Sequence, residues 1–135
     1  MPVSTIMTKD LITINHSDEL TAAESLFKKH SIRHLPVVNG SEIIGMLSYT
    51  DLLRISYADA VYEDETDVDS MVYNMFTIEQ VMAKKLVQVS SQTTIKEVAE
   101  ILAVNGFHAL PVVDDNELVG IVTTTDLINY LLEQY

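Results

Sequence analysis

The sequence of 135 residues contains no cysteine, and its eight Lys and Arg residues face 20 Asp and Glu residues. Without cysteine it has no disulfide framework, no thiolate nucleophile and no cysteine-based zinc site. The formal net charge of -12 opposes binding to bare nucleic acid or to an anionic membrane surface, because both are themselves negative.

Long apolar segments are also missing. No stretch approaches the roughly 18 residues needed to cross a bilayer, and the start of the chain lacks the basic and apolar regions of a signal peptide. We therefore expect a cytoplasmic protein. Hydrophobic residues make up 47% of the chain, which is enough to build a core, and the length predicts one compact domain or two small halves.

The sequence repeats itself with a shift of 75 positions. The tetrapeptide Leu-Pro-Val-Val occurs at residues 35–38 and again at 110–113. The same shift carries Met7 onto Met82, and it continues without a gap as far as residue 52. Chance does not hold one register over such a length, so the chain consists of two copies of one small unit.

Each copy shows the same order of predicted elements: strand, helix, two strands and helix. The first copy has a β-rich run at residues 11–14 and apolar residues at helical spacing over 20–27. Two apolar strands follow at 35–38 and 43–47, on either side of the turn-prone pair Asn39-Gly40. The pattern therefore predicts a β-α-β-β-α unit.

The starts of the helices carry their own signals. Thr94, with Glu97 three positions later, predicts a capping box at the first helix of the second copy. We expect the last helix of the first copy to begin at Thr50 or Asp51, and that of the second copy to begin at Thr125.

These elements predict an α+β fold. Because a unit of about 55 residues buries little surface on its own, we expect the two copies to pack sheet against sheet. We divide the chain into a first copy at residues 1–56, a connector at 57–75 and a second copy at 76–135.

The connector carries six carboxylates and no Lys or Arg, which is half of the net charge. Its apolar residues predict a helix near residues 68–76, preceded by a looser acidic stretch at 63–67. Asp64, Asp67 and Asp69 offer oxygen ligands to Ca²⁺, but the segment lacks the glycine and the terminal Glu of a calcium loop. We therefore favour a solvated acidic surface over a cation site.

A second repeated pattern holds candidate binding residues. A carboxylate in the first turn of a helix can accept both hydroxyls of a ribose, and the backbone N–H groups beside it attract anions. The preceding glycine lets a ligand or a strand approach the backbone. The alternative is that the Thr and Asp residues only cap their helices, worth about 1 kcal/mol each; the two roles can coexist. The pattern comprises Gly45, Ser48, Thr50 and Asp51 in the first copy and Gly120, Thr123, Thr125 and Asp126 in the second.

The two copies each place a basic or titratable residue at the same position of the repeat. Arg33 and His108 lie two residues before the Leu-Pro pair of each copy. A cationic or titratable donor at this point suits a phosphate, although each could also be an exposed residue of a loop. No His or Glu spacing supports a metal site.

Signatures of catalysis are weak. Ser48 and Thr123 lack the context of a nucleophile elbow, and the sequence has no phosphate-binding loop of the Walker type. We expect Asp51 and Asp126 to occupy separate sites, so they do not form an acid/base pair. The sequence therefore favours a protein that is not an enzyme.

Together, these duplicated motifs resemble the tandem CBS domain, or Bateman module. The resemblance rests on Met7 and Met82, on the Leu-Pro-Val-Val strands and on the Gly-x-x-Ser/Thr-x-x-Asp pattern, and it covers nearly all of the chain except the connector. It implies a CBS-domain pair whose copies meet through their sheets about a pseudo-twofold axis. Such pairs commonly dimerise, bind AMP, ADP, ATP or S-adenosylmethionine in two clefts between the copies, and regulate another protein. No cofactor is required.

The resemblance also implies roles for individual residues: Asp contacts ribose, Ser or Thr contacts ribose or phosphate, and the residue at position 33 or 108 reaches phosphate. The adenine lies against the first strand of the opposite copy. One cleft would then contain Ile12, Thr13, His108, Thr123, Thr125 and Asp126. The other would contain Gln88, Arg33, Ser48, Thr50 and Asp51. Gln88 departs from the more usual Thr, and the scarcity of cations argues against a long polyphosphate.

We therefore expect a regulatory sensor of an adenosine compound that acts in trans on a partner protein, since the two copies and the connector use up the sequence. The alternative is a structural dimerisation scaffold with vestigial clefts; a small hydrolase or transferase is a third class without a nameable catalytic group. Apolar residues at equivalent places suit an isologous homodimer. They are Leu53, Ile55 and Tyr57 in one copy and Ile128, Leu131 and Leu132 in the other.

Overall fold

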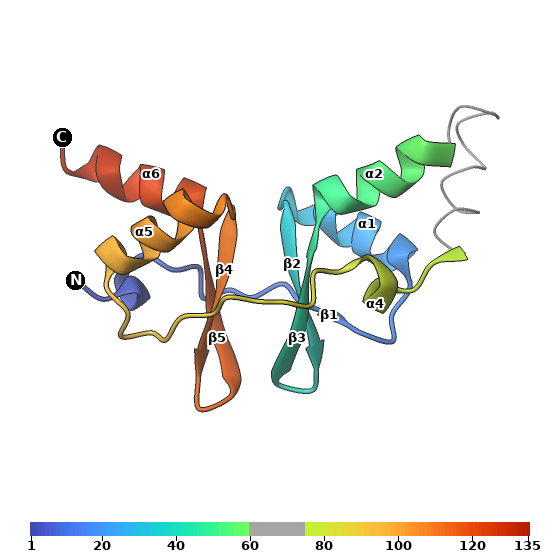
Figure 1. The fold of residues 1–135 in the computed structure, drawn as a ribbon, viewed down its shortest axis with the longest axis horizontal. Helices are drawn as coiled ribbons and strands as arrows, with labels where there is room; N and C mark the ends of the chain where they lie inside the picture. The colour runs from blue at the N-terminus through green and yellow to red at the C-terminus, as the bar shows by residue number, and fades with distance from the viewer. Residues whose placement is uncertain (60–74) are drawn as a thin grey trace. The chain divides into compact units, whose positions relative to one another are not determined.

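The computed structural model describes residues 1–59 and 75–135, and the order of the elements can be followed in Figure 1. The acidic stretch predicted at 63–67, the possible cation cluster and most of the helix predicted near 68–76 lie outside the described residues. Within residues 1–59 and 75–135, none of the helices combines the length and the apolar character that a membrane span requires.

The chain forms two compact units, and they divide the sequence differently from the repeats. One unit is Ile12–Lys85, which we call the first-repeat unit; the other consists of Met1–Leu11 with Leu86–Tyr135, which we call the second-repeat unit. The segment that leads into each repeat therefore packs in the unit of the other repeat.

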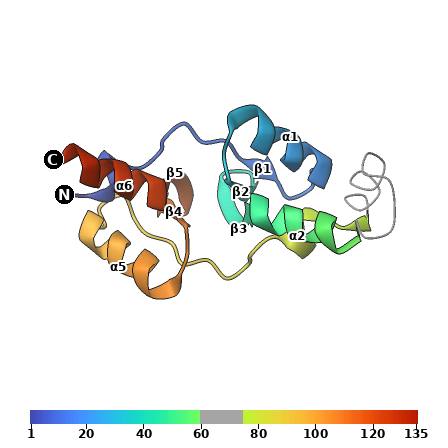
Figure 2. The same cartoon turned by 90° about the horizontal axis from the view of Figure 1, so that it is seen from above.

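The first-repeat unit contains a three-stranded sheet in the order β1-β2-β3. Strand β1 (Ile14–Asn15) runs parallel to β2 (His34–Asn39), which pairs antiparallel with β3 (Glu42–Ser48). Helices α1 (Leu20–His30) and α2 (Tyr49–Asp59) cover the same face of the sheet (Figure 2), and the short α4 (Ile78–Val81) completes the unit.

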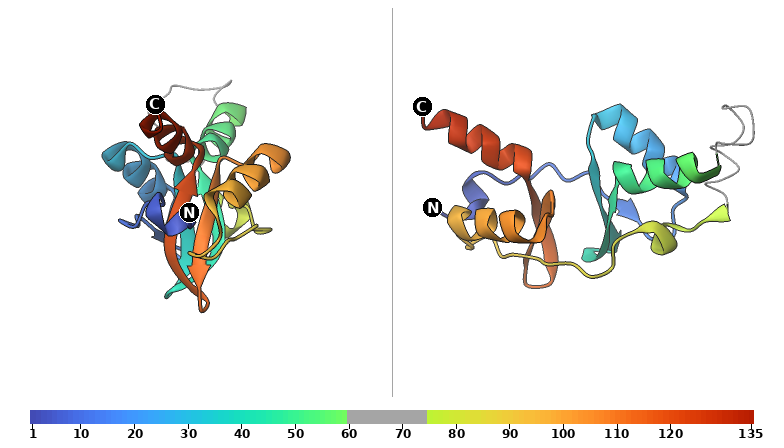
Figure 3. Two further views of the ribbon diagram at one scale, coloured as in Figure 1. Left: turned by 90° about the vertical axis from the view of Figure 1, so that its left-hand side faces the viewer. Right: turned by 45° about the horizontal axis from the view of Figure 1, so that its top comes forward.

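The second-repeat unit has the same plan with one strand fewer. Strands β4 (Ala109–Asp114) and β5 (Glu117–Thr123) form an antiparallel pair. Helices α5 (Ile95–Asn105) and α6 (Thr124–Glu133) cover one face of that pair (Figure 3), and the 3-10 helix η1 (Val3–Thr5) packs in the same unit. Here β1 has only a single parallel bridge as its counterpart, between Val89 and Val112.

Three expectations about element boundaries need correction. The predicted strand at residues 11–14 is reduced to Ile14–Asn15, because only these residues find partners, on Val37 and Val38 of β2. Helices α2 and α6 begin at Tyr49 and Thr124, earlier than predicted, because each follows its strand without a loop.

The third expectation that needs correction is the capping box predicted at the start of α5, of which only one of the two hydrogen bonds is formed. The Thr94 side chain accepts a hydrogen bond from the Glu97 backbone N–H at 3.1 Å, and the cap of α5 consists of this bond. A complete box occurs instead at α4, between Thr77 and Gln80.

Each unit has its own hydrophobic core, built from the apolar faces that the sequence predicts. In the first-repeat unit, Leu20, Ala23 and Phe27 of α1 pack with the buried positions of β2 and β3. In the second-repeat unit, Val98 and Leu102 of α5 pack with the corresponding strand residues. Val3 of η1 is fully buried in this second core, so the leading segment contributes to the stability of the unit.

The repeated glycines and methionines meet one another. The side chain of Met82 packs on Gly45 of β3, and that of Met7 packs on Gly120 of β5. Beside each contact the leading segment pairs with the strand: Thr8 exchanges two backbone hydrogen bonds with Ile121, at 2.8 and 3.0 Å. The close approach expected at these glycines is therefore made by a methionine of the chain itself.

Candidate functional site

The candidate residues gather where β3 turns into α2 and where β5 turns into α6. In the first-repeat unit the backbone N–H of Tyr49 donates to the Arg33 carbonyl at 2.8 Å. In the second-repeat unit the Thr124 N–H donates to the His108 carbonyl at 3.0 Å. Arg33 and His108 are thus held in the same way beside the first turn of the last helix.

The hydroxyls that cap these helices are Ser48 and Thr123. The alternative that assigned capping to the Thr and Asp residues of the pattern is therefore wrong for Thr50 and Thr125, but it holds for Asp126, which takes part in the cap of α6. Ser48 Oγ accepts from the Asp51 N–H at 3.0 Å, and Thr123 Oγ1 accepts from the Asp126 N–H at 3.2 Å. The reason is that each helix starts directly after its strand, so the last strand residue occupies the cap position.

The two carboxylates have different partners. Asp126 completes a capping box, since its Oδ2 accepts from the Thr123 N–H at 2.9 Å, and its Oδ1 accepts from the Thr8 hydroxyl at 3.5 Å. Asp51 Oδ1 lies 3.7 Å from the guanidinium of Arg54, one turn further along α2. The carboxylate of Asp126 thus accepts two hydrogen bonds from within the chain, whereas that of Asp51 lies beside a cation.

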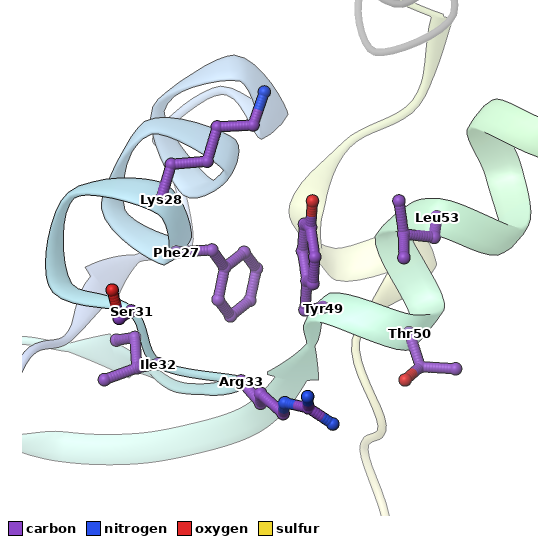
Figure 4. Close-up of a pocket in the computed structure, with 8 residues that line it drawn as sticks. All are labelled: Phe27, Lys28, Ser31, Ile32, Arg33, Tyr49, Thr50 and Leu53. Carbon is purple, nitrogen blue, oxygen red and sulfur yellow. The ribbon is translucent and has the colours of Figure 1, made fainter.

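A pocket of about 390 Å³ opens between α1 and α2. Figure 4 shows the rings of Phe27 and Tyr49 next to each other in its lining, with ring centroids 5.3 Å apart and an angle of 48° between the rings. Arg33 and Thr50 line the same pocket. Ser48 and Asp51 are not among its lining residues, so the pocket takes in only part of the candidate group of the first-repeat unit.

Sequence reasoning missed several residues of these sites. Tyr49 lies inside the repeated motif, but its partner Thr124 is polar, so the repeat pattern did not select it. Thr8 reaches Asp126 across 118 positions, and only the pairing of Met7 with Met82 pointed to this segment.

The structure brings together part of each expected group. Arg33, Ser48, Thr50 and Asp51 lie in the first-repeat unit, and their counterparts His108, Thr123, Thr125 and Asp126 lie in the second-repeat unit. The half-buried Ile12 and Thr13 belong to the first-repeat unit and the exposed Gln88 to the second-repeat unit. Each expected group therefore takes members from both units, and their assembly into one site stays a prediction.

Within the described part of the chain, no three His, Cys, Asp or Glu residues are grouped so that they could hold an ion. The site consists instead of hydroxyls, one carboxylate per unit, and Arg33 or His108. Such a set suits a ligand with sugar hydroxyls and an anionic or polar extension.

In a comparison with known protein families, the model of the CBS domain matches this chain twice, at residues 3–58 and at residues 78–133. The chain is 29% identical to the CBS domain-containing protein YhcV of Bacillus subtilis over 125 residues, which cover 93% of this chain and 81% of YhcV. It is 26% identical to the uncharacterized protein MJ1225 of Methanocaldococcus jannaschii, covering 92% of this chain but only 45% of MJ1225.

Solved structures give the same result. The CBS domain pair of protein MJ0100, solved with 5'-methylthioadenosine and S-adenosyl-L-methionine, is similar with a TM-score of 0.83 and 25% identity, covering 100% of this chain and 98% of that one. The structure of MJ1225, described as a putative archaeal homolog of the AMPK gamma subunit, has a TM-score of 0.82 and 25% identity, covering 96% of this chain and 47% of that one.

Proposed function

Because the chain belongs to the CBS domain family, with both of its repeats matched, we propose that it is a regulatory module that binds an adenosine compound and acts on a partner protein. The observation that carries the proposal is the duplicated arrangement at the ends of β3 and β5. Each copy offers a capped helix start, a carboxylate in the first turn and a basic or titratable residue held by the backbone beside it. The similar CBS pair of MJ0100 binds two adenosine compounds.

Each residue type has a defined part in this proposal. The carboxylates of Asp51 and Asp126 accept hydrogen bonds from the ribose hydroxyls, which a carboxylate does through two oxygens at once. Arg33 and His108 donate to the polar extension of the ligand. The apolar segments at residues 12–14 and 87–89 flank the adenine, and their backbone groups select adenine over guanine.

The first test is a ligand screen. A compound that binds only the native state raises the melting temperature, because it adds RT ln(1 + [L]/Kd) to the free energy of unfolding. We expect AMP, ADP, ATP or S-adenosylmethionine at millimolar concentration to raise the melting temperature, and matched guanosine compounds to raise it less. Absence of both a thermal shift and a calorimetric heat with all four compounds would contradict the proposal.

The substitution Asp126→Ala tests the site itself. Loss of a charged hydrogen bond to ribose weakens binding by about 1.5–3 kcal/mol in titration calorimetry. Because Asp126 also caps α6, the variant loses stability as well, and Thr94→Ala is the matched control. That variant removes the cap of α5 and lowers the melting temperature, but leaves the affinity unchanged. If the affinity for the adenosine compound is unchanged in Asp126→Ala, then Asp126 serves only to cap α6 and does not bind the ligand.

A structural scaffold is the second candidate function. The exposed side of α6 presents Ile128, Leu131 and Leu132, whose side chains are 56%, 55% and 64% exposed. Their exposure favours contact with a second chain. In this alternative, assembly persists while the ligand screen stays negative. In either case we infer a cytoplasmic location and no catalytic activity of the module.

A further inference from the structure

The segment between α1 and β2 differs in charge from its counterpart between α5 and β4. Residues 28–34 read Lys-Lys-His-Ser-Ile-Arg-His, whereas residues 103–109 read Ala-Val-Asn-Gly-Phe-His-Ala. The first segment holds three of the eight Lys and Arg residues, and no Asp or Glu occurs between Glu24 and Glu42. In a chain of net charge -12 this is a local reversal of sign.

The structure places part of this charge at a pocket that one further binding candidate, Thr50, also lines. Lys28 and Arg33 line the pocket between α1 and α2 together with Ser31 and Thr50. In Figure 4 the Arg33 guanidinium and the Thr50 side chain are both drawn below the Tyr49 ring. Lys28 also contacts Glu24 at 3.1 Å, so Arg33 is the main carrier of the local charge.

The difference is chemical, because the geometry is the same in both units. The carbonyls of Arg33 and His108 accept equivalent backbone hydrogen bonds, at 2.8 and 3.0 Å, from the first residue of the following helix. A guanidinium at this point is permanently charged and binds phosphate through two N–H groups, whereas an imidazole is a single titratable donor.

The surroundings of the two carboxylates, Asp51 and Asp126, also differ, and again the first repeat is the more positively charged. Asp51 is partly neutralised by Arg54 at 3.7 Å, and the position equivalent to Arg54 in the second repeat is Asn129. Asp126 is bound by the hydroxyl of Thr8 and by the amide of Thr123, which are neutral donors. The second repeat has no Lys or Arg at the positions equivalent to Arg33 and Arg54. A phosphate beside Asp126 would therefore be repelled by a carboxylate whose negative charge is not balanced there.

We propose that the two repeats select different classes of adenosine ligand. The first-repeat site (Arg33, Ser48, Thr50 and Asp51) takes an adenosine that carries a phosphate. The second-repeat site (His108, Thr123, Thr125 and Asp126) takes an adenosine whose extension is uncharged or cationic, such as a thioether or a sulfonium. This inference rests on the proposed function, because it assigns a ligand class to each of the sites named there.

Calorimetric titration of the full chain with AMP and with 5'-methylthioadenosine tests the division. We expect one AMP per chain, with an affinity that falls as salt is added, because a charge pair is screened. We expect 5'-methylthioadenosine to bind equally well in the presence of saturating AMP, since it occupies the other site.

The substitution Arg33→Ala should weaken AMP binding by about tenfold or more, the effect of losing a charged hydrogen bond, and change 5'-methylthioadenosine binding by less than about twofold. Lys96→Ala is the matched control, because it removes one positive charge from an exposed position of α5. The converse variant His108→Arg should raise the AMP stoichiometry from one to two. Circular dichroism checks that all three variants keep the fold.

The outcomes separate this inference from the proposed function. Two equal AMP sites in the unmodified chain, competition between the two compounds for one site, or unchanged AMP affinity in Arg33→Ala would overturn the division of ligand classes and leave the sensor intact. No binding of any adenosine compound would overturn both.

Discussion

Asp114, at the end of β4, shows how one hydrogen bond joins segments that are distant in sequence. Its Oδ1 accepts from the backbone N–H of Ser91 at 3.0 Å, which ties the loop before α5 to the sheet. The side chain and then the backbone N–H of Ser91 stabilise the charged carboxylate and lower the pKa of Asp114 below its ordinary value, against a weaker opposing effect of desolvation.

This contact predicts a pH dependence of stability. Because the pKa of Asp114 is lower in the folded state, the bond contributes above the unfolded pKa of about 3.9 and is lost as the pH falls through the folded value. We expect NMR titration to give a lowered pKa for Asp114, and Ser91→Ala to move it towards the ordinary value. An ordinary pKa in the unmodified protein would contradict the contact.

At the scale of elements, the docking of each leading segment on a strand decides which residues share a unit. Thr8 pairs with Ile121 of β5, and Ala83 pairs with Met46 of β3, through backbone hydrogen bonds of 2.8 to 3.0 Å. The glycine beside each pair admits a methionine side chain where any larger residue would collide.

We therefore predict that Gly120→Ala is destabilising. A Cβ at this position would lie 2.6 Å from the Met7 sulfur and 3.1 Å from the Thr8 carbonyl oxygen, so the leading segment must shift. Overpacking of this kind costs about 1–3 kcal/mol in chemical denaturation.

The double variant Met7→Ala/Gly120→Ala is the control for this prediction. It should lose less than the sum of the two single variants, because removal of the methionine relieves the collision. Strict additivity would show that the two residues do not interact.

At the scale of the whole molecule, the exposed apolar residues of α6 predict self-association. A cluster of three large apolar side chains on one helix is costly in water, and a twofold contact between chains buries it on both sides. We expect a homodimer, so light scattering should return about twice the 15.1 kDa of one chain.

The variant Leu131→Glu should convert the dimer into a monomer, because a carboxylate in an apolar contact remains without a partner. Val104→Glu is the matched control: this side chain is 83% exposed on α5, and its change adds the same charge away from the cluster. A mass of one chain for the unmodified protein at micromolar concentration would refute the dimer.

The sequence was most informative where a pattern is local or is written twice. Helix α1 and the hairpins β2–β3 and β4–β5 agree with prediction, because apolar spacing and turn residues act over a few positions. The Ser48/Asp51 and Thr123/Asp126 pairs were selected because they recur at one shift. The sequence could not tell which hydroxyl caps, since that depends on how closely the helix follows its strand.

The repeat, the α+β class and the candidate residues could be predicted from the amino-acid sequence, because periodicity and duplication are local patterns along the chain. Three contacts became visible only in three dimensions: Met7 packs on Gly120, Thr8 contacts Asp126, and Phe27 and Tyr49 line the same pocket as Arg33. These contacts join segments up to 118 positions apart. Their partners are chosen by packing in space, which leaves no period in the sequence.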